Sequence, residues 1–457
     1  MTYDYLVLDI DSKIPLYQQL YLSLKKAIEA GHLAKGMKLP SIRKLSEDLG
    51  LSRTTIESAY QQLCVEGYIR SSPQRGYFIQ TEKRTSSVPQ KQTFSSPRTV
   101  SPKIRYNFGT DFVDSSNIDI KIWKRHIRDV LNHQEVIASY GDPQGEPALR
   151  EALAQYSYGV RGVHTSAEQI VIGAGIQPLL TILCGLLRGH PSVAMEEHGF
   201  LQAERVFSDC GMRVRYLPAD EDGIEMDALK RSGAKVVLLS PSNRIHTGAT
   251  IPMSRRFALL EWAKQSGSIL IEDDYNGELR YRARPIPAMQ GMDGGENVVY
   301  IGSFSKLLLP SVRIGYMVLP DPLLERYLPR ARSYNQTSSK IEQLALAGYI
   351  KSGQLERHLR RLRKLYAAKA SALIRELEAA FDGHARIILQ ETALRLILRL
   401  DPETDAQTLC RLALEHGVRV QPTENEPACI TLGFAGIPLE QIPAAVECLK
   451  NAWEPCK

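Results

Sequence analysis

The stretch GSFSKLLLPSVRIG, from Gly302 to Gly315, decides how the larger part of this chain is expected to fold. It places one lysine, Lys306, directly after the SFS segment with its two serines and upstream of an arginine, Arg313. Apolar segments flank the lysine, VVYIG on one side and LLLP on the other. A solvated surface lysine has no need of neighbouring hydroxyl groups or of a nearby cation. The pattern therefore predicts that Lys306 lies at the edge of a buried strand.

Upstream of this stretch, short apolar runs alternate with helical patterns. The runs are QIVIGAG, SVAMEE, KVVLLSPSN, SILIEDD and NVVYIGSFSK. Such runs alternating with helices are typical of a mainly parallel sheet that is covered on both faces, so the sequence predicts the α/β class. Ligands of these sheets bind beyond the carboxyl ends of the strands. Because each run ends in small or polar residues, we expect the functional site at that edge.

In SILIEDDYNGE, the apolar run SILI is followed by three acidic residues and then by Tyr275. Together with Lys306, it matches the needs of a pyridoxal phosphate (PLP) site, where a lysine forms a Schiff base and an aspartate pairs with the pyridinium nitrogen. A serine hydroxyl and Arg313 suit the phosphate, as do helix amides in the glycine-rich turn of IGAGIQPLL. Each motif alone is weak, because SxSK occurs by chance and EDDY also suits a solvated turn or a metal-binding cluster. Their order, each at the end of a predicted strand, favours PLP.

Residues 1–80 follow a different pattern. The helical segment IPLYQQLYLSLKKAIEAG precedes SIRKLSEDLG, which is capped by Ser41 and ends at Gly50. A further helix begins at Ser52, and two short helices joined by a tight glycine-containing turn form a helix-turn-helix. The residues YIRSSPQRGYFIQ then predict two strands with Gly76 at the tip of their turn, which is a wing. A helical hairpin with exposed threonine and arginine side chains is the structural alternative.

Residues 81–105 join the two parts. The segment is rich in serine, threonine, proline and basic residues, and Glu82 is its single acid. It has too few large apolar side chains to fold by itself, so the composition predicts a linker. Its positive charge suits a phosphate backbone, and a solvated tether is an equally good interpretation.

Bulk composition restricts the class of protein. A chain of 457 residues is too long for one ordinary core, which predicts two or three domains. Its net charge of +6 permits a nucleic-acid partner without requiring one. The seven scattered cysteines lack CxxC spacing, which argues against a zinc site or a disulfide framework. No apolar run approaches the roughly 20 residues that span a bilayer, and the acidic N-terminus does not look like a signal peptide. We expect a soluble, cytoplasmic protein without a metal site.

Two resemblances extend this interpretation. Residues 12–80 closely resemble the GntR-type winged helix through PLYQQL, through KLPSIRKLSEDLGLSRTTIESAYQQLCVEGYI and through the glycine-containing wing. From Tyr106 onward the chain resembles the fold-type I aminotransferases, and the combination resembles the MocR/GabR family over nearly the whole chain. The domains that this implies are a winged-helix DNA-binding domain at 1–80, a flexible basic linker at 81–105, and a PLP-binding effector domain at 106–457 with a small α+β subdomain from about residue 330.

The resemblance also assigns roles to individual residues. Lys306 would form the Schiff base, Asp273 would pair with the pyridinium nitrogen, and Tyr275 would bind the ring O3′. Phe200 would stack on the ring, and Tyr140 would reach across to the neighbouring site in a dimer. The remaining cofactor contacts would be Ser303, Ser305, Arg313, Asn243 and the backbone amides near Gly175 and Ile176. The DNA contacts would be Arg43, Ser52, Arg53, Thr54, Thr55, Arg75 and Gly76, with the start of the second helix reaching base edges.

The chain departs from the family pattern in two places. In the loop SPSNRIHTG, Ile245 stands where an asparagine that holds O3′ is expected, and Asn243 is the candidate substitute. In ACITLGFAG, Thr431 stands where an arginine clamps the α-carboxylate of the substrate. A hydroxyl group does not replace a bidentate guanidinium. Arg419 and Arg244 are the candidate replacements.

The favoured function is a PLP-dependent transcription regulator. It would bind an operator of two half-sites as a homodimer, arranged head-to-tail, and would sense PLP itself or an amine or amino acid that reacts with PLP at Lys306. Thr431 slightly favours PLP as the signal, and an ω-amino acid or a dipeptide is the other effector considered. The alternative function is a working aminotransferase with an accessory DNA-binding domain, and weak transaminase activity is compatible with either. A scaffold that has lost PLP is disfavoured because Lys306, Asp273, Tyr275 and Arg313 are all present.

Overall fold

The computed structural model describes residues 3, 5–9, 12, 14–80, 104–110, 112–114, 118–197, 200–244, 247–281, 286–389, 394–400, 404–423 and 426–454. The chain divides into two compact units, Met1–Thr99 and Val100–Lys457. Each unit is described by itself. Apart from its last two residues, the linker expected at 81–105 lies outside the described residues.

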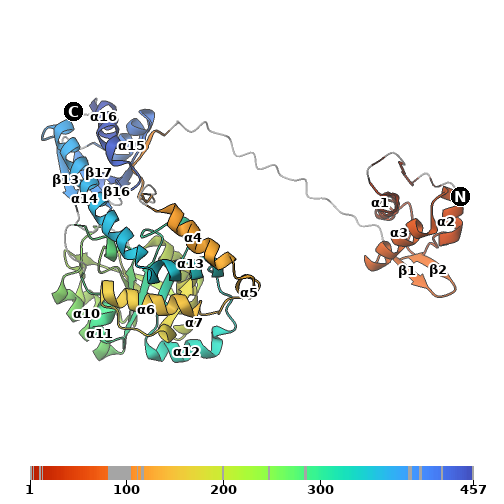
Figure 1. Cartoon of the computed structure of the whole chain (residues 1–457), viewed down its shortest axis with the longest axis horizontal. Coiled ribbons are helices and arrows are strands. Elements are labelled where there is room, and N and C mark those ends of the chain that lie inside the picture. The colour runs from red at the N-terminus through yellow and green to blue at the C-terminus, as the bar shows by residue number, and fades with distance from the viewer. Residues whose placement is uncertain are drawn as a thin grey trace. The chain divides into compact units, whose positions relative to one another are not determined.

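Three helices open the N-terminal unit (Figure 1). The Ser41 hydroxyl caps the second helix by accepting from the amide of Lys44. Gly50 ends this helix in the left-handed conformation, with φ of 66°, which side chains other than glycine rarely adopt. The Ser52 hydroxyl caps the third helix by accepting from the amide of Thr55. The predicted helix-turn-helix is confirmed, and its helices are α1 (Leu16–Glu29), α2 (Ile42–Leu49) and α3 (Arg53–Val65).

The predicted wing is a two-stranded antiparallel hairpin of β1 (Ile69–Ser72) and β2 (Gly76–Ile79). Gly76 was expected at its tip, but it is the first residue of β2 and pairs with Ser72. The turn residue in the left-handed conformation is Gln74, with φ of 60°. Ile69 and Ile79 join both strands to the helical core of this unit, whose other buried members include Leu20, Leu24, Ile28, Leu45, Ile56, Tyr60 and Leu63.

The C-terminal unit is built around a sheet that has seven strands among the described residues, in the order β4-β12-β11-β10-β9-β5-β6. Only β12 runs antiparallel to its neighbours in this part of the chain. The predicted α/β class with a mainly parallel sheet is thereby confirmed. The strands are β4 (Ile170–Gly173), β5 (Ser192–Glu196), β6 (Arg213–Leu217), β9 (Val236–Leu239), β10 (Ile269–Asp274), β11 (Val298–Ser303) and β12 (Gly315–Val318).

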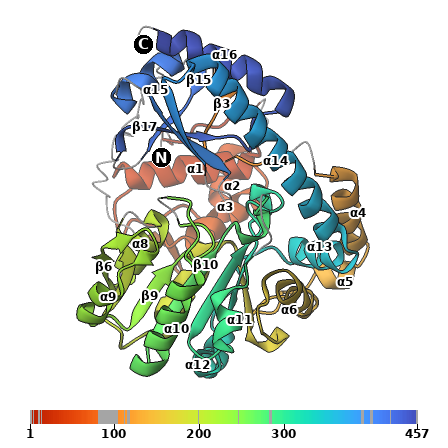
Figure 2. The same cartoon turned by 90° about the vertical axis from the view of Figure 1, so that its left-hand side faces the viewer.

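Both faces of this sheet are covered, as Figure 2 shows for the helices around β9 and β10. Alternate residues of one strand enter different cores: Val171 packs with α7 and α8, whereas Ile170 and Ile172 pack on the other face. This is why the strands read as continuous apolar runs. The helices of this unit as far as residue 351 are α4 (Ile120–Leu131), α5 (Gln134–Ile137), α6 (Pro147–Arg161), α7 (Ile176–Leu186), α8 (Leu201–Asp209), α9 (Met226–Ser232), α10 (Met253–Ser266), α11 (Met289–Asp293), α12 (Asp321–Ala331) and α13 (Lys340–Lys351).

A smaller sheet follows the long helix α14 (Gln354–Phe381). Two of its strands were predicted, but the described sheet has four, in the order β13-β14-β17-β16. The outer two strands, β13 and β16, have no clear apolar pattern in the sequence, because each lies at an edge of the sheet and is half-exposed. The remaining elements are β3 (Tyr106–Asn107), β7 (Ala219–Asp220), β8 (Gly223–Ile224), β13 (Ala385–Leu389), β14 (Arg395–Leu400), α15 (Ala406–Glu415), β15 (Val418–Arg419), β16 (Gln421–Thr423), β17 (Glu426–Gly433) and α16 (Ile442–Trp453).

Among the described residues, no helix is both long enough and apolar enough to cross a membrane.

Candidate functional site

The strand register gathers the predicted cofactor residues at one edge of the main sheet. Asp274 pairs with Gly302 across β10 and β11, so the two strands end side by side. Ser303 pairs with Gly315, which in turn pairs with Gly173. The register therefore brings these three segments together at one edge of the sheet. Ligands of open parallel sheets bind at this edge, beyond the carboxyl ends of the strands.

Two of the three acids at the end of β10 are bound to the surrounding fold. The carboxylate of Glu272 accepts hydrogen bonds from the amides of Met289 and Gln290, both at 3.0 Å. The carboxylate of Asp274 accepts from Nε of Arg161 at 2.6 Å, and both partners are buried. Alternate residues of a strand point to the same face, so these two acids share a face that Asp273 does not.

Asp273 points to the opposite face and is 4% exposed. Burial raises the pKa of this carboxyl to about 7, the nearby Asp274 adds to the effect, and the Ser240 hydroxyl opposes it. A carboxyl group so placed is stabilised in its charged form by a cation, such as a pyridinium, at the same site. The interpretation of EDDY as a solvated turn is excluded by the burial of all three acids.

Tyr275 and Asn243 come from the loops after β10 and β9 and meet at this edge. Nδ2 of Asn243 donates to the Tyr275 hydroxyl at 2.8 Å. Asn243 is 4% exposed, and its Oδ1 has no hydrogen-bond partner within the described residues. Because buried polar atoms normally have partners, this oxygen fits a site that a polar ligand completes. Ile245, the other residue singled out in this loop, lies outside the described residues.

An anion site fits at the start of α7. Gly175 has φ of 90° and immediately precedes this helix of 11 residues. Nη2 of Arg313 donates to the carbonyl oxygen of Ala174 at 3.3 Å, and a Cβ on Gly175 would lie 2.9 Å from the same Nη2. Glycine at this position therefore leaves room for the guanidinium beside the helix N-terminus, and both groups attract a phosphate.

Lys306 lies in the turn that follows β11, beside the two serines. Its Nζ donates to the carbonyl oxygen of Thr110 at 2.6 Å. The amide of Ser305 donates to the Ser303 hydroxyl at 3.3 Å, which orders the turn before the lysine. Thr110 was not identified from the sequence, because a backbone carbonyl carries no signal in the residue type.

The two predicted aromatic contacts have different surroundings. Phe200 is at the N-cap of α8 and packs, half-buried, against the core on the Asp273 side of the sheet. Tyr140, in the loop after α5, is fully exposed. The structure therefore does not pack Tyr140 into the site of its own chain, and its expected role in a dimer stays a prediction.

The two expected replacements for the missing arginine have different outcomes. Arg244 is not available, because it is 5% exposed and its Nε donates to both carboxylate oxygens of Glu196, at 3.0 and 3.2 Å. Its Nη1 donates to two further backbone carbonyls. Arg419, on the short strand β15, is exposed. Thr431 itself forms a hydroxyl–hydroxyl hydrogen bond of 2.9 Å with Thr423.

A further arginine near the candidate site, Arg395, was not identified from the sequence. It is the first residue of β14, and its charge acts on the Tyr275 phenol, where it opposes the rise in pKa that burial causes. The signal was present in the sequence ALRLILRL, where a cation opens an otherwise apolar strand pattern. Charged residues at strand ends are common, so the pattern alone did not single it out.

The predicted DNA-contacting residues of the N-terminal unit are presented on its surface. Arg53 and Thr54 are exposed in the first turn of α3. The Ser52 hydroxyl shares hydrogen bonds of 2.8 Å with the hydroxyls of Thr54 and Thr55. Arg43 is exposed on α2, where its Nε pairs with Glu47 at 3.0 Å. The wing carries Arg75 exposed beside Gly76.

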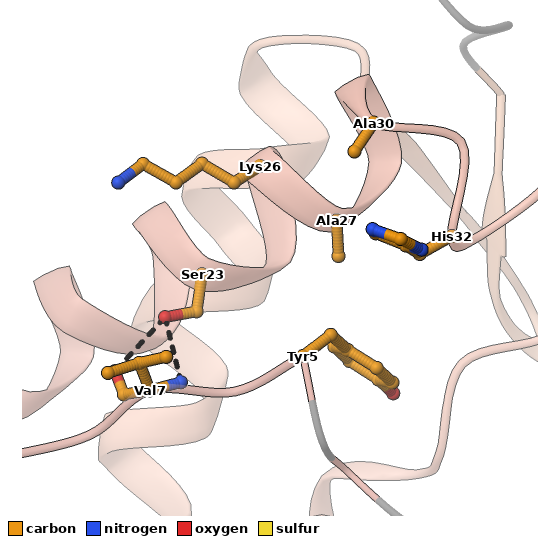
Figure 3. A pocket seen from close by; sticks show the side chains of 7 residues that line it. All are labelled: Tyr5, Val7, Ser23, Lys26, Ala27, Ala30 and His32. Atoms are coloured by element: carbon orange, nitrogen blue, oxygen red, sulfur yellow. Dashed lines mark hydrogen bonds between the residues drawn. The ribbon is translucent and has the colours of Figure 1, made fainter.

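The N-terminal unit also has a pocket of about 450 Å³ between its first residues and α1. Figure 3 shows Tyr5 and His32 at one end and Lys26 at the other. The Ser23 hydroxyl accepts from the amide of Val7 and donates to its carbonyl oxygen, at 3.3 and 3.1 Å. These bonds tie the N-terminal segment to α1, so the pocket is part of the packing of this unit and contains none of the cofactor residues.

Comparisons with known proteins match both units. Residues 16–79 match the family described as "Bacterial regulatory proteins, gntR family". Residues 107–449 match "Aminotransferase class I and II". Among solved structures, an archaeal alanine:glyoxylate aminotransferase superposes with a TM-score of 0.68 over 77% of this chain and 91% of its own, at 24% identity. That likeness shows the fold of the C-terminal unit.

Full-length relatives have the same arrangement. The chain is 36% identical over 455 residues to the "Uncharacterized HTH-type transcriptional regulator YdeL" of Bacillus subtilis, covering 96% of this chain and 97% of the relative. It is 30% identical over 474 residues to the "Probable rhizopine catabolism regulatory protein MocR" of Rhizobium meliloti, covering 98% and 96%. Helix-turn-helix regulators thus match both units in one alignment. The chain belongs to the MocR/GabR family of DNA-binding transcription regulators, in which a GntR-type winged helix is joined to an aminotransferase-like, PLP-binding domain.

Proposed function

We propose that PLP held at Lys306 makes the C-terminal unit a sensor, and that the state of this site controls operator binding by the winged helix. The observation that carries the proposal is Asp273, a buried carboxyl with its pKa raised to about 7 at the same sheet edge as the lysine. A structural acid is normally given an ion pair, as Asp274 is by Arg161. Asp273 instead suits a cationic ring supplied by the cofactor.

The surrounding residues fit the other parts of PLP. Arg313 and the amides at the start of α7 would hold the phosphate. The Tyr275 hydroxyl, which accepts from Asn243, keeps its own proton free to donate to the ring oxygen. When bound, the cofactor supplies an aldehyde that reacts with amines and a ring that withdraws electrons. An effector amine would compete with the lysine for that aldehyde, and this competition is the proposed signal.

Sensing is favoured over turnover because the full-length relatives that match both units are named as regulators. In addition, Thr431 stands at the place where the resemblance to aminotransferases expects an arginine, and Arg244 is engaged by Glu196. The alternative is a working aminotransferase, which the intact Lys306 and Asp273 would permit. Continuous production of a keto acid from an amino acid, at many cycles per protein, would establish the alternative. A single stoichiometric reaction without turnover supports the sensor.

Assembly is part of the proposal. The site of a fold-type I protein lies at a dimer interface, and the fully exposed Tyr140 suits a contact with the neighbouring chain. We therefore expect a head-to-tail homodimer whose two winged helices bind two half-sites. Footprinting that shows one half-site protected by a monomer would contradict this assembly.

The cofactor assignment is tested with Lys306→Ala. The purified wild-type protein should absorb visible light and should form a covalent cofactor adduct on treatment with borohydride. Lys306→Ala should lose the adduct, whereas the control Lys351→Ala should keep it, since Lys351 is an exposed lysine whose partner is Glu151. An adduct that persists in Lys306→Ala would refute the assignment.

A further inference from the structure

We infer that Arg395 binds the carboxylate of an amino-acid effector, a role for which Thr431 carries no charge. The inference rests on the proposed function, because it concerns an amine that reacts with PLP at Lys306. It extends that function by naming the ligand class as amines that bear a carboxylate. Arginine suits this class because its planar guanidinium binds a carboxylate with two parallel hydrogen bonds.

The strand register places Arg395 close to the position of Thr431. Strands β14 and β17 are antiparallel, with Arg395 opposite Gly433 and Ile397 opposite Thr431. Residues opposite one another in an antiparallel pair share a face of the sheet, and the diagonal neighbour on that face is about 7–8 Å away. Arg395 and Thr431 are such diagonal neighbours. An arginine side chain is long enough to bring its guanidinium to the space in front of the threonine.

This end of the small sheet adjoins the segment that contacts Lys306. The amide of Gly433 donates to the carbonyl oxygen of Phe108 at 2.8 Å. Two residues later, the carbonyl oxygen of Thr110 accepts from Nζ of Lys306 at 2.6 Å. A Cβ on Gly433 would lie 2.7 Å from the carbonyl oxygen of Gly109, so the segment passes directly over the strand. Arg395, which is opposite Gly433, is therefore one strand away from the segment that contacts Lys306.

A second observation relates Arg395 to the main sheet. Tyr275 follows β10 of the main sheet, whereas Arg395 belongs to the small sheet. Of the charged groups that act on the Tyr275 phenol, Arg395 has the largest effect, exceeding those of Asp273 and Asp274. The guanidinium therefore lies within electrostatic reach of the residue assigned to the ring oxygen of PLP.

The surface beside Arg395 is polar. Thr431 and Thr423 share a hydroxyl–hydroxyl hydrogen bond of 2.9 Å, and Gln421 is opposite Thr431 across β16 and β17. The Thr110 hydroxyl donates to Oε1 of Gln421 at 3.5 Å. Hydroxyl and amide groups of this kind can donate to a carboxylate that the guanidinium already holds.

The other arginine on this face of β14 serves as a matched control. Arg399 is four residues further along the strand, so it points to the same face. Its Nη2 pairs with Glu426 at 2.9 Å, and its Nε contacts Cys429. In the register Arg399 is paired with Cys429. Arg399 and Arg395 are thus on either side of the pair that contains Thr431, and Arg399 is on the side away from Gly433. A substitution of Arg399 removes the same charge from the same strand as one of Arg395, but Arg399 is further from the segment that contacts Lys306.

The experiment compares matched ligands on PLP-loaded protein. Glycine with methylamine, β-alanine with ethylamine, and 4-aminobutyrate with propylamine are titrated while the cofactor absorbance is followed. Wild type should bind at least one amino acid ten-fold or more tightly than its matched amine. Arg395→Gln should abolish that preference by weakening the amino acid while leaving the amine unchanged, and Arg399→Gln should retain it. The preferred pair identifies whether the carboxylate is α or ω to the amine.

Each other outcome also decides the matter. A ten-fold preference that survives in Arg395→Gln would overturn the inference. An unchanged cofactor spectrum would verify that Arg395→Gln is folded. Arg395→Lys keeps the charge and loses the bidentate geometry, so it should retain part of the preference. A wild type that reacts with PLP but prefers no amino acid would overturn the inference and leave the proposed function intact. A wild type that binds no PLP would instead refute the proposed function.

Discussion

Nδ2 of Asn243 donates a hydrogen bond of 2.8 Å to the Tyr275 hydroxyl. The two residues follow neighbouring parallel strands, β9 and β10, so the sheet itself brings them together. The expectation from sequence was that Asn243 substitutes for the residue missing at Ile245. The structure adds a means for this, because the amide orients the phenol that is assigned to the cofactor ring.

This hydrogen bond predicts the behaviour of Asn243→Ala. Losing a neutral hydrogen bond costs about 0.5–1.5 kcal/mol, so PLP affinity should fall about 3–10-fold. Absorbance titration with PLP measures the change. Asn297→Ala is the control, because its amide contacts Asp293 rather than any residue of the site. Equal PLP affinity in the two variants would show that the Asn243 contact is only structural.

Gly175→Ala should weaken binding of the phosphate. An alanine Cβ would approach Nη2 of Arg313 to 2.9 Å and displace the guanidinium. Gly189→Ala is a matched control, since Gly189 also has positive φ, at 105°, but a Cβ there would meet no atom within 4 Å. Both variants place alanine at a positive φ, which costs about 1–3 kcal/mol of backbone strain. Only Gly175→Ala should bind PLP less well while binding pyridoxal, which lacks the phosphate, as wild type does. Equal losses for both ligands would argue against a phosphate site.

Asp273 predicts a pH dependence of stability in PLP-free protein. Its pKa rises from 3.8 to about 7 on folding, so the folded state holds the proton more tightly than the unfolded state. The stability that the neutral carboxyl provides is fully present below about pH 4 and is lost as the pH rises towards 7. The loss amounts to at most about 4 kcal/mol. Chemical unfolding of Asp273→Asn should therefore show a gain relative to wild type that grows from pH 4 to pH 8.

The comparison isolates Asp273 because two other buried acids, Glu272 and Glu278, also have a pKa raised to about 7. Both acids are present in wild type and in Asp273→Asn, so their contributions to the pH dependence cancel in the comparison. Adding PLP should reverse the order at pH 8, because the ionised carboxylate gains a cationic partner that asparagine cannot match. If PLP stabilises both proteins equally, Asp273 is not the partner of the ring.

Much of this site could be predicted from the sequence because its residues lie at the ends of strands with clear apolar runs. Lys306 and Asp273 follow such runs, and the register places both at one edge. The choice among the three acids was not visible in the same way. That choice depends on Arg161, which forms an ion pair with Asp274 and belongs to a helix distant in the sequence.

What the sequence could not show was where each arginine lies relative to the site. Arg244 looked suitable beside the loop, but Glu196, Asp220 and Glu221 enclose it through contacts between distant segments. Arg395 looked like an ordinary strand end, and only the pairing with Gly433 brings it near the site. Side-chain pairing between remote segments has no local pattern, so these assignments required the structure.

In the winged helix, Arg53→Ala should relax base discrimination. Arg53 is exposed at the N-terminus of α3, the end that contacts bases in this motif. A bidentate base contact contributes about 1–3 kcal/mol of discrimination. Binding to single-base variants of an operator selected from random DNA measures it. Lys44→Ala is the control, because Lys44 is a cation of the same unit that pairs with Asp48 and is not among the expected DNA contacts. If Arg53→Ala weakens binding equally on every sequence, its contact is with phosphate.

Control of DNA binding by the state of PLP at Lys306 is tested by the affinity of full-length protein for its selected operator, with and without PLP, in wild type and in Lys306→Ala. We expect PLP to change the wild-type operator affinity several-fold and to leave that of Lys306→Ala unchanged, since a ligand shifts an equilibrium only through its differential affinity for the two states. A wild-type operator affinity that is the same with PLP, without PLP and with added amines would show that the site does not control DNA binding.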